Sequence, residues 1–126
     1  MLKFFYFGLA LIWTLVVAFL CLANFNNLPR VSLQNADKYV HFTFHFVFTF
    51  LWFLYFNQNN AKSNYLNIIL LVFLLSFSYG IGVEIMQGLF TISRKADIFD
   101  VLANTTGSIA AIILISLYQM VNKKIK

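Results

Sequence analysis

The acidic residues of this chain lie beside or inside its apolar stretches, where an unpaired charge is costly. The chain of 126 residues has only four Asp and Glu residues. Glu84 lies within the apolar stretch 65–90, while Asp97 and Asp100 begin the next apolar stretch, and Asp37 begins an earlier one. Acids in such positions are usually paired with other groups. They are therefore the first candidates for a site.

Two histidines follow Asp37 on what would be one face of a helix. Asp37, His41 and His45 are spaced i, i+4 and i+8. A histidine near carboxylates can take part in general acid–base catalysis or bind a divalent metal, and the catalytic candidates are His41, Glu84 and Asp100. No H-E-x-x-H or G-x-S-x-G motif accompanies them, and a third ligand for a His41–His45 pair has to be assumed. The sequence therefore predicts neither a bound metal nor a cofactor.

The elements that must position these residues are long apolar segments. The chain is 61% hydrophobic and only 10% charged, whereas a soluble domain has about 25% charged residues. A soluble domain of this length cannot bury so much apolar surface. About 20 apolar residues in a helix cross the hydrocarbon core of a bilayer. We expect a single all-α domain over residues 1–126, an integral membrane four-helix bundle with short loops and spans at about 4–23, 38–56, 65–90 and 97–121.

The basic residues indicate how these spans are oriented. Four spans place both termini and the middle loop on one side of the membrane. That side contains the residues Lys3, Lys62, Lys123, Lys124 and Lys126, and the other side contains Arg30, Lys38, Arg94 and Lys95 beside all three Asp residues. The cluster of lysines at the C-terminus favours termini in the cytoplasm. The net charge of +5 is scattered along the chain, which argues against a nucleic-acid partner.

The only cysteine, Cys21, lies in an apolar run. A single cysteine excludes an internal disulfide and a cysteine-cluster metal site. We interpret Cys21 as a small hydrophobic residue.

This topology brings the unusual polar residues into one layer near the outer ends of three spans. The predicted ligand-binding residues are Asp37, Lys38, His41, Glu84, Gln87, Arg94, Asp97, Asp100 and Asn104. We expect Lys38, Arg94 and Lys95 to neutralise the acids. Acids at the starts of the second and fourth spans also lie at the positive ends of the helix dipoles.

The same residues resemble the VanZ-like family of small bacterial membrane proteins over about residues 37–108. The matching elements are Asp37-Lys38-x-x-His41, then Glu84-x-x-Gln87, and then Arg94-x-x-Asp97-x-x-Asp100-x-x-x-Asn104-x-x-Gly107. The resemblance implies a multi-pass protein of the bacterial cytoplasmic (inner) membrane. It also implies an association with resistance to the glycopeptide antibiotic teicoplanin.

Three interpretations of the polar layer are compatible with the sequence. A transport pore is disfavoured, because the polar residues do not line a path across the bilayer. The layer can bind a lipid, a lipid-linked phosphate or a glycopeptide, with Lys38, Arg94 and two helix N-termini holding an anionic group. The nearby acids argue against a purely anionic ligand unless a cation bridges. Alternatively, the layer is a structural network that fixes helix packing, or His41, Glu84 and Asp100 form an enzyme site for a lipid-linked substrate. Membrane lipids are expected partners in each case, and self-association is compatible with the aromatic surface.

Overall fold

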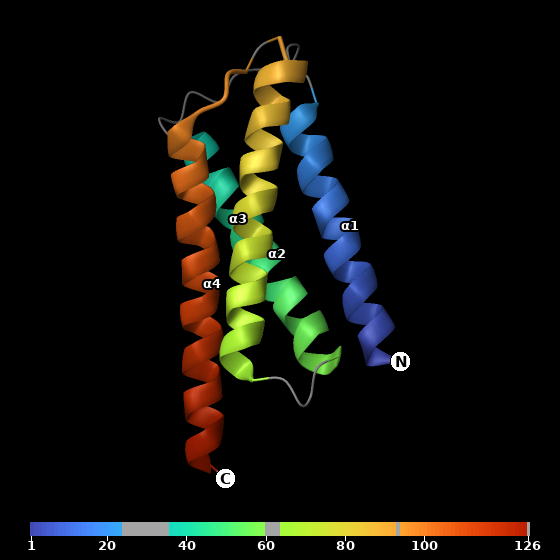
Figure 1. The fold of residues 1–126 in the computed structure, drawn as a ribbon, viewed down its shortest axis with the longest axis vertical. Helices are drawn as coiled ribbons and strands as arrows, with labels where there is room; N and C mark the ends of the chain where they lie inside the picture. The colour runs from blue at the N-terminus through green and yellow to red at the C-terminus, as the bar shows by residue number, and fades with distance from the viewer. Residues whose placement is uncertain (24–35, 60–63, 93, 126) are drawn as a thin grey trace.

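The computed structural model describes residues 1–23, 36–59, 64–92 and 94–125, and within these ranges the chain is all-α, without a strand. Its helices are α1 (Leu2–Leu22), α2 (Ala36–Asn59), α3 (Tyr65–Phe90) and α4 (Ile98–Ile125). They run alternately up and down, so both termini lie at one end of the bundle (Figure 1). The expected all-α class and the placement of both termini on one side are confirmed.

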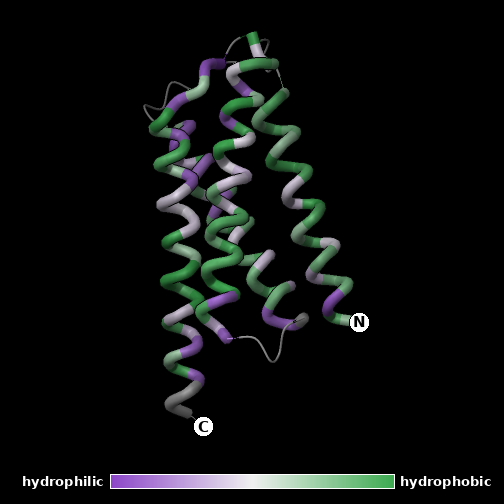
Figure 2. Tube along the Cα trace, in the orientation of Figure 1, coloured by the Kyte–Doolittle hydropathy of each residue, from purple (hydrophilic) through white to green (hydrophobic). Residues whose placement is uncertain are grey.

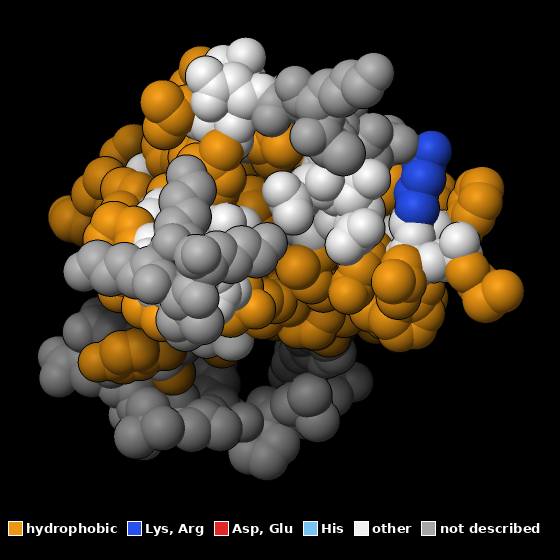
Figure 3. Space-filling model, turned by 90° about the horizontal axis from the view of Figure 1, so that it is seen from below, with side chains coloured by type: hydrophobic (Ala, Val, Ile, Leu, Met, Phe, Trp, Pro, Cys, Tyr) orange, Lys and Arg blue, Asp and Glu red, His pale blue; other side chains and the backbone are white. Residues whose placement is uncertain are grey.

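All of the helices are long and apolar enough to cross a membrane. Hydrophobic residues fill the middle of the bundle and hydrophilic residues collect near its two ends (Figure 2). Viewed along the bundle from below, the described side chains are mostly hydrophobic up to the outer edge (Figure 3). Large apolar residues such as Leu15 and Phe19 on α1 are more than 60% exposed, which is the pattern of a surface that faces lipid instead of water.

Helix α2 packs against each of the other helices, most extensively against α4. The α2–α4 approach is close at Gly107, where an added Cβ would lie only 2.2 Å from the carbonyl oxygen of Phe42. A residue without a side chain is therefore required here, as small residues are at many membrane helix contacts. This close packing brings the beginning of α2 beside the beginning of α4.

Helix α1 is joined to the bundle by hydrogen bonds between side chains and main-chain carbonyls as well as by apolar packing. The Trp13 indole on α1 donates to the carbonyl of Phe44 on α2, with a nitrogen–oxygen distance of 3.0 Å. From α3, the Tyr79 hydroxyl donates to the Thr14 carbonyl at 2.5 Å, and the Gln87 amide donates to the Cys21 carbonyl at 2.9 Å. Such bonds between membrane helices contribute about 0.6 kcal/mol each, so together they help to set the position of α1.

Apolar clusters occupy the remaining interior. One, made by Phe53, Ile68, Val72 and Ile115, joins α2, α3 and α4. Cys21 is buried against Val17 and Val83, as expected for a small hydrophobic residue. The buried acids Glu84 and Asp100 and the buried His41 lie elsewhere, toward the end of the bundle opposite the termini (Figure 1).

Candidate functional site

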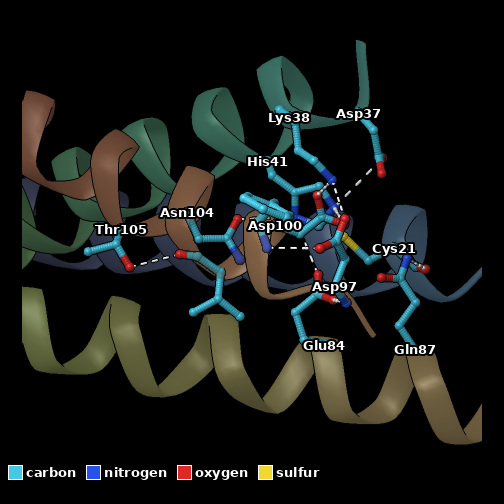
Figure 4. A network of polar contacts seen from close by, with 12 residues as sticks. Cys21, Asp37, Lys38, His41, Glu84, Gln87, Asp97, Asp100, Asn104 and Thr105 are labelled. Atoms are coloured by element: carbon cyan, nitrogen blue, oxygen red, sulfur yellow. Dashed lines mark hydrogen bonds and ion pairs between the residues drawn. The ribbon is translucent and has the colours of Figure 1, made fainter. Parts of the chain in front are cut away.

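A polar cluster forms where the beginning of α2, the last turns of α3 and the beginning of α4 meet (Figure 4). We define it by its residues Asp37, Lys38, His41, Glu84, Asp97, Asp100 and Asn104. Each helix delivers its members on one face, because residues spaced i, i+3 and i+4 project together. The cluster brings together seven of the nine residues predicted from the sequence.

Lys38 is the basic centre of the cluster. Its ammonium group lies 2.6 Å from Asp97 Oδ2 and also bonds to Asp100 Oδ1. The Asp100 side chain is only 5% exposed, so a cation is needed beside it. Lys38 therefore ties the beginning of α2 to the beginning of α4.

Asp97 lies just before α4 and caps it. Its Oδ1 accepts a hydrogen bond of 2.9 Å from the backbone N–H of Phe99, the geometry of an N-cap residue. The hydrogen bond from Lys38 lowers the pKa of Asp97 below its ordinary value, and the bond from the Phe99 N–H lowers it further. Both bonds favour the charged carboxylate.

His41 lies at the centre of the cluster and is 2% exposed. Its Nδ1 is 3.1 Å from Asn104 Oδ1 and 3.7 Å from Glu84 Oε1. Its Nε2 faces Asp37 Oδ1 at 3.8 Å and Asp100 Oδ2 at 3.7 Å. The imidazole is therefore surrounded by carboxylate oxygens at distances too long for hydrogen bonds.

Glu84 connects α3 to the cluster and is 3% exposed. Its Oε2 accepts a hydrogen bond of 3.1 Å from the backbone N–H of Asp97. Its Oε1 has no hydrogen-bond partner among the described residues, and neither does the Asn104 Nδ2 atom. A buried polar atom without a partner is costly in a purely structural network.

Two predicted site residues take other positions. Gln87 points toward α1, where it bonds the Cys21 carbonyl. Arg94 makes no ion pair with a described carboxylate, and its carbonyl accepts a 3.3 Å hydrogen bond from Thr91 Oγ1. The expectation that Arg94 and Lys95 would pair with the acids was wrong for the described part of the chain, where Lys38 is the only Lys or Arg residue that does so. The reason is geometric: Lys38 shares a helix turn with His41, and so it projects into the cluster.

A second group of buried polar residues extends from the cluster toward the middle of the bundle. His45 Nδ1 lies 2.7 Å from Ser76 Oγ, and Ser76 lies 2.7 Å from Ser108 Oγ. Ser108 in turn donates to the Asn104 carbonyl at 3.1 Å. The close approach of α3 to the side chains of His45 on α2 and Asn104 on α4 depends on Gly80. An added Cβ at Gly80 would lie 3.0 Å from both side chains.

The serines of this second group were not among the predicted site residues. A signal was present in the sequence, because Ser76 lies one turn from Gly80 and two turns from Glu84, while Ser108 lies one turn from Asn104. The imidazole of His45 pairs with Ser76 on another helix. This contact replaces the metal-ligand pair with His41 that the sequence spacing allowed.

A cavity of about 200 Å³ lies beside the cluster, between α3 and α4. It is lined by Ile81, Glu84, Ile85, Ala96, Asp97, Ile98 and Val101. Ile85 and Ile98 are 54% and 67% exposed, so the cavity opens on the apolar outer surface. It combines apolar walls with two carboxyl groups, which suits an amphipathic molecule.

Comparisons with known proteins agree with the sequence motifs. A protein-family model described as VanZ/LLP1 matches residues 3–119, which is nearly the whole chain. No curated protein matches the chain. No solved structure matches it either.

Proposed function

The chain belongs to the VanZ/LLP1 family of membrane proteins, and we propose that it binds a lipid or lipid-linked cell-envelope ligand at its polar cluster. The site lies at the outer leaflet of the bacterial cytoplasmic membrane, and both termini lie in the cytoplasm. Binding lowers susceptibility to teicoplanin-type glycopeptide antibiotics.

The cavity beside Glu84 and Asp97 is the observation that supports this proposal most directly. Its isoleucine walls match the apolar chain of a lipid, and the acidic residues Glu84 and Asp97 are also among its lining residues. Carboxylates accept hydrogen bonds. The ligand group that enters is therefore one that offers hydroxyl or amide donors, such as the saccharide or peptide part of a lipid-linked envelope molecule.

The charge balance argues against a simple anionic headgroup in direct contact with the cluster. Lys38 was one of the cations expected to hold such a group, but it is already bonded to Asp97 and Asp100. A phosphate approaching the same place would meet four carboxyl groups in the cluster. Hydrogen-bond donors on the ligand, or a cation accompanying it, fit the cluster better.

A cavity-filling substitution tests the proposal without changing a polar residue. Val101→Phe places a larger apolar side chain in the wall of the cavity. Ile113→Phe is the matched control, because Ile113 is on the same helix, is 54% exposed and does not line this cavity. We expect Val101→Phe to raise teicoplanin susceptibility at unchanged protein level in the membrane, and Ile113→Phe to behave as wild type.

Other outcomes distinguish the alternatives. If both variants at normal abundance leave susceptibility unchanged, the cavity is not the ligand site and the proposal fails. If susceptibility follows protein abundance in every variant, the cluster acts only as a structural network. Turnover of a lipid-linked substrate by the purified protein, lost in His41→Ala, would instead assign an enzyme.

A further inference from the structure

Ligand atoms suited to a metal ion converge between α2 and α4. One atom each from Asp37, His41 and Asp100 lie within 4.8 Å of one another. His41 Nε2 is 3.8 Å from Asp37 Oδ1 and 3.7 Å from Asp100 Oδ2. Two ligands about 2.1 Å from a tetrahedral Zn²⁺ ion are about 3.4 Å apart. The two distances from His41 Nε2 exceed this spacing by only a few tenths of an ångström. The two carboxylate oxygens, which lie within 4.8 Å of each other, would have to approach by up to about 1.4 Å.

The contacts of His41 leave its Nε2 atom facing the carboxylates. Its Nδ1 lies 3.1 Å from Asn104 Oδ1. An amide oxygen only accepts hydrogen bonds, so in this contact the Nδ1 atom carries the proton. In the neutral ring the Nε2 lone pair then faces two carboxylate oxygens. That arrangement is repulsive on its own and becomes favourable with a cation between the three atoms.

Several carboxylate oxygens near His41 are not bonded by Lys38. Asp100 uses Oδ1 to bind Lys38, and its Oδ2 faces the imidazole. The buried Glu84 Oε1 has no hydrogen-bond partner among described residues, although it lies 3.7 Å from His41 Nδ1. Within the cluster, the single lysine pairs with only two of the four carboxyl groups, those of Asp97 and Asp100. This is an independent sign that a positive charge belongs here.

We propose that Asp37, His41 and Asp100 bind a divalent transition-metal cation such as Zn²⁺. The mixed imidazole and carboxylate donors suit this class of ion. Asn104 and Glu84 face the other ring nitrogen and orient the imidazole, as partners of metal-bound histidines commonly do. Asp37 has a half-exposed side chain, which gives the ion access from the outer surface. A fourth coordination position remains for water or a ligand oxygen.

This inference goes beyond the proposed function, since metal binding is measurable without any envelope ligand. Purified full-length protein in detergent is dialysed against Zn²⁺ and its metal content is measured. In parallel, Co²⁺ is titrated into the metal-free protein and its visible absorption is recorded. We expect one equivalent of Zn²⁺ per chain, and Co²⁺ bands typical of low coordination number that Zn²⁺ displaces.

Two histidine variants form a matched pair. His41→Ala removes the central ligand, and we expect it to lose both Zn²⁺ and the Co²⁺ bands. His45→Ala also removes a buried histidine, but one that bonds Ser76 instead of facing Asp37 and Asp100, so it retains both. If wild-type protein binds no Zn²⁺ and gives no Co²⁺ bands, the metal site is overturned, whatever the variants do. Equal loss in both variants, with folding preserved by circular dichroism, would also overturn the assignment of His41.

Discussion

At the scale of single residues, Lys38 determines whether the polar cluster can exist in an apolar surrounding. Asp100 has a 5% exposed side chain and is bonded by Lys38. Removing one partner of a buried ion pair leaves the other charge uncompensated, which costs about 3–5 kcal/mol. Lys38 itself is 28% exposed, so solvent screening reduces this value.

We therefore expect Lys38→Met to lower the free energy of unfolding by about 2–3 kcal/mol. The measurement is equilibrium unfolding of the purified protein in mixed micelles with increasing SDS. Lys95→Gln is the control, because Lys95 is exposed and has no ion-pair partner among the described residues, and we expect a change below about 0.5 kcal/mol. Equal destabilisation by both substitutions would contradict the role given to Lys38.

The residue types of the site could be predicted from the sequence more fully than their pairing. Acids and a histidine near the ends of apolar segments identified Asp37, His41, Glu84 and Asp100, because such residues are costly in lipid unless they have partners. The choice of Lys38 over Arg94 depends on which direction each side chain projects. Lys38 lies within one helical turn of His41, whereas Arg94 lies between α3 and α4, outside any helix. No helical periodicity indicates the direction of a side chain there.

At the scale of helices, the contact between α2 and α4 brings the cluster together. Gly107 allows this contact, since a Cβ there would lie 2.2 Å from the main-chain oxygen of Phe42. Main-chain atoms cannot move aside as a flexible side chain can. The helices would have to separate, and Lys38 would then move away from Asp100.

Gly107→Ala is expected to destabilise the protein by about 1–3 kcal/mol, the usual cost of overpacking. Gly82→Ala is the matched control, because an added Cβ at Gly82 meets nothing within 4 Å. That change is expected to be neutral or to stabilise α3 by up to about 1 kcal/mol, the difference in helix propensity between glycine and alanine. Thermal unfolding of both variants in one detergent measures the contrast, and a Gly107→Ala protein as stable as wild type would refute the close contact.

The helices themselves could be predicted well from the sequence, because length and apolar composition specify a membrane span almost alone. The third helix has the predicted bounds, Tyr65–Phe90, whereas α4 extends to Ile125, beyond the predicted end at residue 121. The serine contacts between α3 and α4 were not predicted. These contacts depend on how α3 and α4 are aligned along the bundle axis. The presence of a serine does not specify this, because serine occurs at both lipid-facing and buried positions of membrane helices.

At the scale of the whole molecule, the bundle has two chemically different ends. Both termini lie at one end (Figure 1), and the polar cluster, where α2 and α4 begin and α3 ends, lies toward the other. The lysines of the C-terminal sequence favour the cytoplasm for the first end. The polar cluster would then face the outer leaflet, where envelope ligands are accessible.

This orientation is tested by cysteine labelling of intact cells in a Cys21→Ser background. Ala96 is exposed near the cluster, and Lys3 is exposed near the N-terminus. We expect Ala96→Cys to react with a membrane-impermeant maleimide in intact cells, and Lys3→Cys to react only after permeabilisation. The reverse pattern would place the polar cluster on the cytoplasmic side and exclude an outer-leaflet ligand.

The most direct test of the central proposal is the teicoplanin susceptibility of cells that express Glu84→Gln, measured together with the amount of protein in the membrane. The substitution keeps the size of the side chain and removes its ability to carry charge beside His41 and Asp97. We predict that susceptibility rises to the value of cells without the protein, while abundance stays at the wild-type value. Wild-type susceptibility at normal abundance, or a change that only follows abundance, would contradict the account of the cluster as a ligand site.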